Sequence, residues 1–260
     1  MELYKKNYAS RNIRGKQRVC EYLSSNPMLE SYVPQTVSFS LEHLEMMINR
    51  YEMVYVKPDI GSHGIGIFKV KKNDSDYELY EIVKKKQVRS LYKSIFDIYD
   101  RIKKQRSAKL IIQKGISLDH VNDCPYDIRA MVQRKPGGTW VCTGLIVKVG
   151  ARNKIVTNHY QGGTILSMKK LGKKQGLSQA ETASRVGKLS RVALQIAHTL
   201  SKKRSGMHEL GVDFAYDKKQ QLWVLEVNSN HPQFYPLKQL DPAAYRKMKR
   251  FAVSYGRRDA

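Results

Sequence analysis

Three side chains in the last quarter of the chain have the types and spacing of a cation site. In the segment WVLEVNSNHP (223–232), Glu226 and Asn228 lie two residues apart in an apolar run, so a strand would point both to one face. A carboxylate on a buried strand needs an arginine, a lysine or a metal ion beside it. Asp213, in the preceding apolar run, joins that face if the two runs pair in an odd register, in which the numbers of paired residues add up to an odd value. A four-residue turn at 217–220 would give that register. An even register would turn Asp213 to the opposite face.

Two carboxylates and a carboxamide oxygen on one face form a set of hard oxygen donors. Such a set suits Mg²⁺, which usually takes one or two protein carboxylates and completes its shell with water and phosphate oxygens. The competing interpretation is an acidic patch neutralised by lysine and arginine, of which the chain has 47.

A glycine-rich segment has residues suited to phosphate binding. VKPDIGSHGIGIFKV (56–70) places Gly61, Gly64 and Gly66 between two β-like runs. Because a strand and not a helix follows, this is neither a P-loop nor a dinucleotide-binding loop. A flap between strands can still lay backbone N–H groups over phosphates, and Lys57 can reach a phosphate oxygen from the incoming strand. The alternative is a flexible hairpin tip with a solvated lysine.

Apolar periodicity outlines the elements that must position these groups. Helices are expected over 16–30, 40–51 and 178–206, the last capped by Ser178 and ended by Gly206. Strands are expected over 53–72 (strand, glycine loop, strand), 109–116, 126–150 (a hairpin turning at 136–138) and 211–228 (a second hairpin). The segment between 72 and about 108 is expected to be a basic, partly helical connector. The pattern predicts an α+β fold with antiparallel sheets.

Composition narrows the class of protein. The 260 residues are 41% hydrophobic and 27% charged, which is enough apolar material for one large domain or two lobes. No apolar run approaches a membrane span, the N-terminal residues lack the apolar block of a secretion signal, and three separated cysteines suggest no disulfide framework. The net charge of +24 predicts attraction to polyanions, but no nucleic-acid-binding signature accompanies it, so nucleic acid is not the expected partner.

Taken in order, these segments resemble the ATP-grasp superfamily. VKPDIGSHGIG corresponds to the phosphate flap, LIIQKGI to the linker at the adenine, YDIRAMVQ to the central sheet and GVDFAYD with LWVLEVN to the metal face. More specifically, YVPQT, VKPDIGSHGIGI, IIQKGISL, YDIRAMVQRKPGGTWVCTG and VTNHYQGG are similar to the YheC/YheD-type ATP-grasp proteins, which are named for association with endospore coats. Five motifs in one order, spanning about 16–250, make the resemblance specific.

The resemblance implies an ATP-grasp fold, in which two α/β lobes with antiparallel sheets grip the nucleotide in the cleft between them. It divides the chain into an N-terminal extension (1–15), an ATP-grasp domain (16–250) and a basic tail (251–260). Within the domain, the smaller lobe would cover about 37–115 and the larger lobe about 116–250.

The resemblance also implies roles for individual residues. Catalytic roles fall to Arg129, which would face the transferred phosphoryl group, and to Lys57 and Asn158, the last near the acceptor. ATP would be held by Lys16, Lys57, Gly61, Ser62, His63, Gly64, Gly66, Gln113, Lys114, Gly115, Ile116, Asp119 and Lys148. One or two Mg²⁺ ions would be held by Asp213, Glu226 and Asn228.

Some of these roles have alternatives. Lys5 is the second choice for the early phosphate-binding lysine assigned to Lys16. Lys148 stands where an arginine is expected, so two-pronged phosphate contact is in doubt there. His63, His159 and His231 could act as acids or bases, although a loop histidine is more often simply solvated.

The activity implied is ATP- and Mg²⁺-dependent ligation of a carboxylate to an amine through an acyl phosphate. The residues leave two alternatives open: a kinase that phosphorylates a hydroxyl, and a degenerate ATP-binding coat component. The carboxylate and nucleophile substrates are unidentified, and the charge would suit an acidic one. Spore coat proteins, or a protein that supplies the further N-terminal domain common in the family, are expected partners, and the expected location is the cytoplasm or the spore coat.

Overall fold

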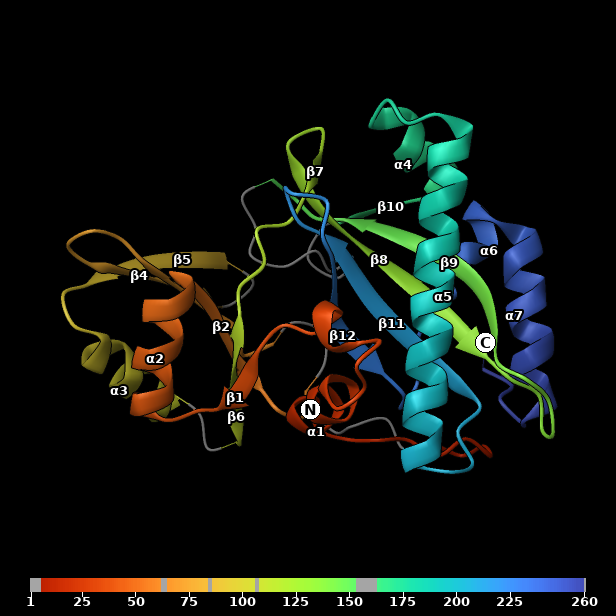
Figure 1. Cartoon of the computed structure of the whole chain (residues 1–260), viewed down its shortest axis with the longest axis horizontal. Helices are drawn as coiled ribbons and strands as arrows, with labels where there is room; N and C mark the ends of the chain where they lie inside the picture. The colour runs from red at the N-terminus through yellow and green to blue at the C-terminus, as the bar shows by residue number, and fades with distance from the viewer. Residues whose placement is uncertain (1–5, 62–64, 84–85, 106–107, 153–162, 260) are drawn as a thin grey trace.

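The computed structural model describes residues 6–61, 65–83, 86–105, 108–152 and 163–259. They form two lobes, each built on an antiparallel sheet, with the smaller lobe on the left of Figure 1 and the larger on the right. The chain belongs to the α+β class predicted from the sequence. Within the described ranges, no helix is both long enough and apolar enough to cross a membrane.

The smaller lobe is a six-stranded sheet covered on one face by two helices. Its strand order is β1-β6-β2-β3-β4-β5. The strands are β1 (Thr36–Ser38), β2 (Met53–Pro58), β3 (Phe68–Lys72), β4 (Tyr77–Val83), β5 (Lys86–Tyr92) and β6 (Leu110–Lys114). The helices are α2 (Leu41–Tyr51) and α3 (Ile95–Gln105), whose apolar stripes bury Leu44, Ile48, Ile98 and Ile102 against the sheet.

The larger lobe has a second sheet with helices on both faces. Its order is β10-β9-β8-β11-β12, and β7 pairs with β8 outside that path. The strands are β7 (His120–Val121), β8 (Cys124–Gln133), β9 (Val141–Val149), β10 (Thr164–Leu166), β11 (Glu209–Tyr216) and β12 (Leu222–Asn228). The helical elements are α1 (Lys16–Ser24), η1 (Glu30–Tyr32), α4 (Met168–Lys174), α5 (Gln179–Lys203), α6 (Leu237–Leu240) and α7 (Pro242–Ser254).

Alternation along β8 divides the core of the larger lobe in two. Ile128, Ala130 and Val132 face the core shared with α1 and α5, whereas Met131 faces the core shared with α6 and α7. In Figure 1, α5 runs along one face of this sheet. The remaining polar side chains of β8 therefore lie on the α7 side, which is the side of the candidate site.

The principal predicted elements are present, with one exception. Ser178 caps α5 and, with Glu181, forms a complete capping box. The expected connector between 72 and 108 was wrong in part: it contains the hairpin β4–β5 before the helix α3. Strand β5 is a sheet edge with mostly exposed side chains, so the apolar alternation that reveals a strand is weak there.

Candidate functional site

The hairpin β11–β12 presents the predicted carboxylates on one face. Asp213 pairs directly with Glu226, which is the odd register, and Asn228 follows two residues later along β12. The turn does not produce this register, because Tyr216 pairs with Leu222 across five residues and by itself would turn Asp213 away. A β-bulge between Asp213 and Phe214, which leaves Leu225 as the extra residue on β12, restores it.

Asp213 is held by two cations from neighbouring strands. The Arg129 Nε and Nη2 atoms donate to its two oxygens at 2.8 and 2.7 Å, and Lys148 Nζ lies 3.2 Å from Oδ1. Burial favours the neutral acid, but the charges of Arg129 and Lys148 outweigh it and lower the pKa of Asp213 to about 2. Asp213 is therefore ionised at neutral pH, and the arginine predicted to meet phosphate is tied to the predicted metal face.

Glu226 is bound by a lysine that also contacts the smaller lobe. Lys16 Nζ lies 3.2 Å from Glu226 Oε1 and donates to the carbonyl of Gly61 at 3.0 Å. The Glu226 side chain is 38% exposed, in contrast to 9% for Asp213, so it is the more accessible of the two carboxylates. Lys16 thus joins the glycine segment to β12, and it is the early lysine that the sequence singled out.

The position of Lys16 depends on an N-terminal anchor of α1. Gly15, just before the helix, has φ +96°, and the Asp59 carboxylate accepts a hydrogen bond from the Gln17 amide at 2.9 Å. The Lys16 amide donates to the Asp59 carbonyl at 2.9 Å. Sequence reasoning missed Asp59, although its place before the first glycine of the loop was a signal that it could cap a neighbouring element.

Lys57 lies in a partly buried polar group of the smaller lobe. Its Nζ donates to Gln113 Oε1 at 2.6 Å, and Gln113 Nε2 in turn donates to Thr36 Oγ1 at 2.9 Å and to Cys20 Sγ at 3.7 Å. Burial lowers the pKa of Lys57. No described carboxylate forms an ion pair with Lys57, so this ammonium is the cation of the site best placed to gain from an incoming anion.

Asp127 is a further member of the site that sequence reasoning missed. It lies opposite Lys148 in the β8–β9 pairing, and Lys148 Nζ contacts its Oδ1 at 2.8 Å. The signal was its spacing in YDIRAM, which puts it two residues before Arg129 and hence on the same face of the strand. Lys148 is therefore engaged by two carboxylates.

The residues predicted to line the adenine lie at the end of β6. Lys114 Nζ stands 4.2 Å from the centre of the Trp223 ring, which is a cation–π contact. The Gly115 amide donates to the Met53 carbonyl, and a Cβ on Gly115 would lie 2.8 Å from Met53, so only glycine fits. Ile116 is buried. Their contact with adenine stays a prediction.

Asp119, which is predicted to accept a hydrogen bond from the ribose, accepts several hydrogen bonds within the larger lobe. Its carboxylate accepts hydrogen bonds from the His120 amide and from the side chains of Tyr126, Gln175 and Gln220. Burial raises the pKa of Asp119, but these hydrogen bonds lower it by more.

Several predicted residues lie outside the described ranges. These are Lys5, Ser62, His63, Gly64, Asn158 and His159. Gly61 and Gly66 flank the gap in the glycine loop, and Gly66 has φ +73°, a conformation that favours glycine.

The donor set fits Mg²⁺ by its chemistry. Among the described residues, no group of three or more His, Cys, Asp or Glu side chains is arranged to hold a metal ion, so a site here rests on two carboxylates and one carboxamide. Asn228 Oδ1 accepts the Asn230 amide at 3.0 Å, and the His231 amide is at 3.5 Å, the limit of a hydrogen bond. Because only the Asn230 amide lies at an ordinary hydrogen-bond distance, one of the two lone pairs of Asn228 Oδ1 remains for a cation.

One lobe carries a glycine loop between strands, and a lysine joins this loop to an acidic hairpin in the antiparallel sheet of the other lobe. This arrangement is that of the ATP-grasp class. The chain belongs to the family described as YheC/D like ATP-grasp, which matches residues 5–258.

Two proteins of Bacillus subtilis (strain 168) are similar to this chain. The endospore coat-associated protein YheD is 27% identical over 218 residues, which cover 82% of this chain and 47% of YheD. The endospore coat-associated protein YheC is 20% identical over 227 residues, which cover 86% of this chain and 62% of YheC. The chain thus spans less than two thirds of either relative.

Proposed function

We propose that the protein is an ATP- and Mg²⁺-dependent ATP-grasp enzyme that joins a carboxylate to an amine through an acyl phosphate. The observation that carries the proposal is the convergence of charged side chains from both lobes. The cations are Lys16, Lys57, Arg129 and Lys148, and the carboxylates are Asp127, Asp213 and Glu226. Lys57 has no ion pair with a carboxylate among the described residues, and its positive charge suits the phosphates of a nucleotide.

Glu226 and Asn228 would hold Mg²⁺, with Asp213 as the third oxygen donor. When bound, Mg²⁺ supplies charge neutralisation on the phosphate oxygens and helps to orient them. Both oxygens of Asp213 already accept hydrogen bonds from Arg129, so Asp213 can bind the ion only while it also contacts Arg129 and Lys148. Two of the five N–H groups of Arg129 are used in these bonds, and the others can meet a phosphoryl oxygen.

In the proposed reaction, an oxygen of the substrate carboxylate attacks the terminal phosphorus of ATP, the bond to the bridging oxygen breaks, and ADP leaves. An amine nitrogen then attacks the carbonyl carbon, phosphate leaves with the bonding electron pair, and the nitrogen loses a proton. The protein's share is to position the reactants and to offset developing charge with Lys57 and Arg129. This scheme needs no nucleophile from the protein itself.

The names of the two relatives support an association with the spore coat. Both are called endospore coat-associated. We extend that association to this chain, with coat proteins as partners, and we infer that the net charge of +24 favours an acidic acceptor. Glutamate-rich peptides and matched neutral peptides should then differ in affinity at low salt, and the difference should shrink as salt rises. Equal binding at every ionic strength contradicts the acidic acceptor.

Mg²⁺-dependent ATP binding, measured by calorimetry, tests the proposal. The wild type should bind ATP with Mg²⁺, and Glu226→Gln should lose most of the Mg²⁺-dependent part. Glu45→Gln, the same change at an exposed position of α2, is the matched control and should bind as the wild type does. If the wild type binds no ATP, the enzyme proposal falls and the degenerate alternative takes its place.

Hydroxylamine trapping separates the ligase from the kinase. Hydroxylamine attacks an acyl phosphate to give a hydroxamate and free phosphate, whereas it leaves a phosphate ester intact. Incubation of the protein with Mg²⁺, ATP, hydroxylamine and a panel of acidic substrates should yield a hydroxamate. A stable phosphorylated hydroxyl compound, with no hydroxamate, contradicts the ligase assignment.

A further inference from the structure

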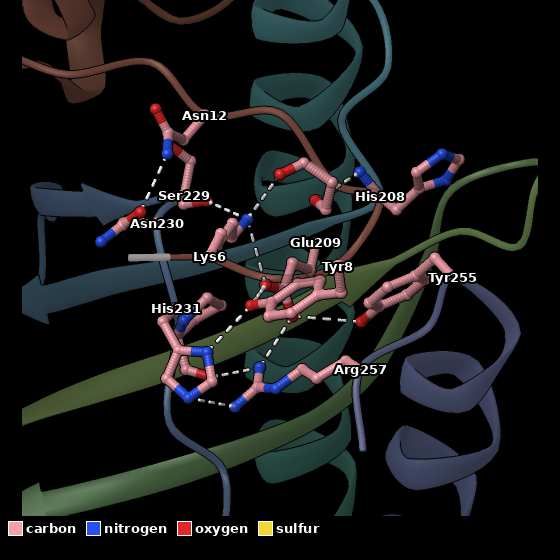
Figure 2. Close-up of polar contacts among 12 residues, drawn as sticks. Lys6, Tyr8, Asn12, His208, Glu209, Ser229, Asn230, His231, Tyr255 and Arg257 are labelled. Atoms are coloured by element: carbon pink, nitrogen blue, oxygen red, sulfur yellow. Dashed lines mark hydrogen bonds and ion pairs between the residues drawn. The ribbon is translucent and has the colours of Figure 1, made fainter. Parts of the chain in front are cut away.

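A buried charged cluster lies at the opposite end of β11 from the hairpin turn (Figure 2). Its centre is Glu209, which is 0% exposed although it is a carboxylate. Four side chains meet it. Tyr8 donates its hydroxyl to Oε1, Tyr255 and Arg257 donate to Oε2 at 3.1 and 2.7 Å, and Lys6 Nζ lies 3.3 Å from Oε1. A buried carboxylate with this many donors is fully compensated.

The cluster gathers the two segments that were expected to be an extension (1–15) and a basic tail (251–260). Lys6 and Tyr8 come from the first segment and Tyr255 and Arg257 from the second, yet all four contact the same carboxylate. Arg257 is only 1% exposed. Lys6, Tyr8, Tyr255 and Arg257 are thereby anchored to β11 of the larger lobe.

Three of these side chains also hold the loop that follows β12, which we call the 229–232 loop (Ser229–Pro232). Lys6 Nζ donates to the Ser229 carbonyl at 2.8 Å, and Arg257 Nη1 donates to the Pro232 carbonyl at 2.9 Å. The Tyr8 hydroxyl lies 2.9 Å from His231 Nδ1. Further bonds join Ser229 Oγ to the backbone of Ile13 and Asn230 Oδ1 to Asn12.

The ring of His231 is held at both of its nitrogen atoms. The Tyr8 hydroxyl donates its hydrogen bond to Glu209, so its oxygen can accept from His231 Nδ1. His231 Nε2 lies 3.3 Å from Arg257 Nη2 and 3.3 Å from an Asp259 carboxylate oxygen. The ring thus joins the loop to Tyr8, Arg257 and Asp259.

Gly211 forms the floor beneath this loop. A Cβ on Gly211 would lie 2.8 Å from Pro232 Cβ and 3.5 Å from Arg129 Cδ, so the loop crosses β11 in direct contact with the strand. Gly211 lies midway between Glu209 and Asp213, and alternation puts all three on one face of β11. The loop therefore spans the distance from the Glu209 cluster to the candidate Mg²⁺ site.

The loop begins directly after Asn228, a proposed metal ligand. The amides of Asn230 and His231 lie 3.0 and 3.5 Å from the Asn228 carboxamide oxygen, so the loop backbone sets the rotamer of that side chain. Any displacement of the 229–232 loop moves these two amides and releases Asn228.

We propose that the Glu209 cluster is the positioning device of the Mg²⁺ site, with Tyr8, Lys6 and Arg257 as positioning residues that act through the 229–232 loop on Asn228. This inference rests on the proposed function, because it takes Asn228 to be a metal ligand. Lys6, Tyr8 and Arg257 thus contribute to the affinity for the metal without contacting it.

Two tyrosines of the same cluster supply a matched pair of variants. Tyr8 and Tyr255 each donate a hydroxyl to Glu209, but Tyr8 also contacts His231 of the loop, whereas Tyr255 accepts from Gln133 Nε2 of β8 at 2.7 Å. Tyr8→Phe and Tyr255→Phe therefore remove similar bonds to one carboxylate, and only the first removes a support of the loop.

The probe is Mn²⁺, a substitute for Mg²⁺, titrated by electron paramagnetic resonance with a non-hydrolysable ATP analogue. Tyr8→Phe should weaken Mn²⁺ binding by about tenfold, as expected for loss of a support behind a metal ligand, while affinity for the analogue without metal stays unchanged. Tyr255→Phe should bind Mn²⁺ within about twofold of the wild type. Gly211→Ala, which displaces Pro232 without touching the Glu209 bonds, should reproduce the weakening seen in Tyr8→Phe.

The outcomes separate this inference from the proposed function. Thermal unfolding first establishes that each variant is folded, and Gly211→Ala replaces Tyr8→Phe as the deciding variant if the latter is not. A wild type that binds analogue and Mn²⁺ beside folded variants with unchanged Mn²⁺ affinity overturns the positioning role alone. Equal weakening in Tyr8→Phe and Tyr255→Phe also overturns it, because the cluster would then act only through stability. A wild type that binds neither probe overturns the proposed function, and the inference with it.

Discussion

The two cations proposed to meet phosphate should have unequal effects on stability when they are removed. Lys57 Nζ donates to the neutral side chain of Gln113, whereas Arg129 makes a two-pronged ion pair with Asp213, whose side chain is 9% exposed. The test compares Lys57→Met with Arg129→Met. Methionine keeps most of the side-chain volume and removes the charge in both cases.

The expected magnitudes follow from these partners. In the wild type, burial of the ammonium lowers the pKa of Lys57, and Lys57→Met removes this desolvation cost. The substitution also leaves Gln113 Oε1 without this donor, at a cost of about 1–3 kcal/mol. The two terms offset each other, and we expect a net change within about 1 kcal/mol. Arg129→Met leaves the Asp213 carboxylate with Lys148 alone, and breaking a buried pair in this way should cost about 3 kcal/mol.

Urea and thermal unfolding, each with and without Mg²⁺ and ATP, provide the assay. At about 2–4 °C per kcal/mol, the Arg129→Met midpoint should fall below that of Lys57→Met by about 4–16 °C. ATP at about 100 times its dissociation constant should stabilise the wild type by about 2.7 kcal/mol, and Lys57→Met should lose that gain. Equal destabilisation by the two substitutions would refute the reasoning, and so would a full ATP-induced shift in Lys57→Met.

Two further predictions concern stability. Gly15→Ala should destabilise the protein by about 1–3 kcal/mol in urea unfolding, because Gly15 has φ +96° and a Cβ would lie 3.1 Å from an Asp59 oxygen; an unchanged midpoint contradicts this. Hydrogen bonds from Tyr80 and Arg89 lower the pKa of Glu78 from 4.5 to about 2, so its stabilising contribution is present above pH 4.5 and is lost as the pH falls towards 2. The wild type should therefore lose about 1–2 kcal/mol more than Glu78→Gln between pH 6 and pH 2.5, after a discount for the exposed arginine; parallel losses contradict the shift.

Local patterns predicted that Glu226 and Asn228 share a face, because period-two alternation is a short-range property. Asp213 joins them in the odd register, which was one of the two registers left open by the sequence. The means by which it does so could not be read from the sequence. A bulge depends on how two strands twist against their neighbours, and no residue type at Leu225 announces it.

Long-range charge pairs were beyond sequence reasoning for a different reason. The contact of Tyr8 with Glu209 spans 201 residues, and nothing near either residue indicates the other. The pairing of Asp127 with Lys148 depends on the register between β8 and β9, which also contains a bulge, at Met131/Val132. Periodicity thus located the faces of the strands, while partners across the sheet required the fold.

The arrangement of the Glu209 cluster has a consequence for the order of folding during synthesis. The strands of the smaller lobe all lie between Thr36 and Lys114, so that lobe can form its sheet soon after it emerges from the ribosome. Lys6 and Tyr8 emerge before it but must wait for Glu209, and then for Arg257, before their hydrogen bonds can close. Lys6 and Tyr8, which are made before the smaller lobe, are therefore buried after it. A nascent chain with a complete smaller lobe still lacks the charged residues that the larger lobe contributes to the candidate site.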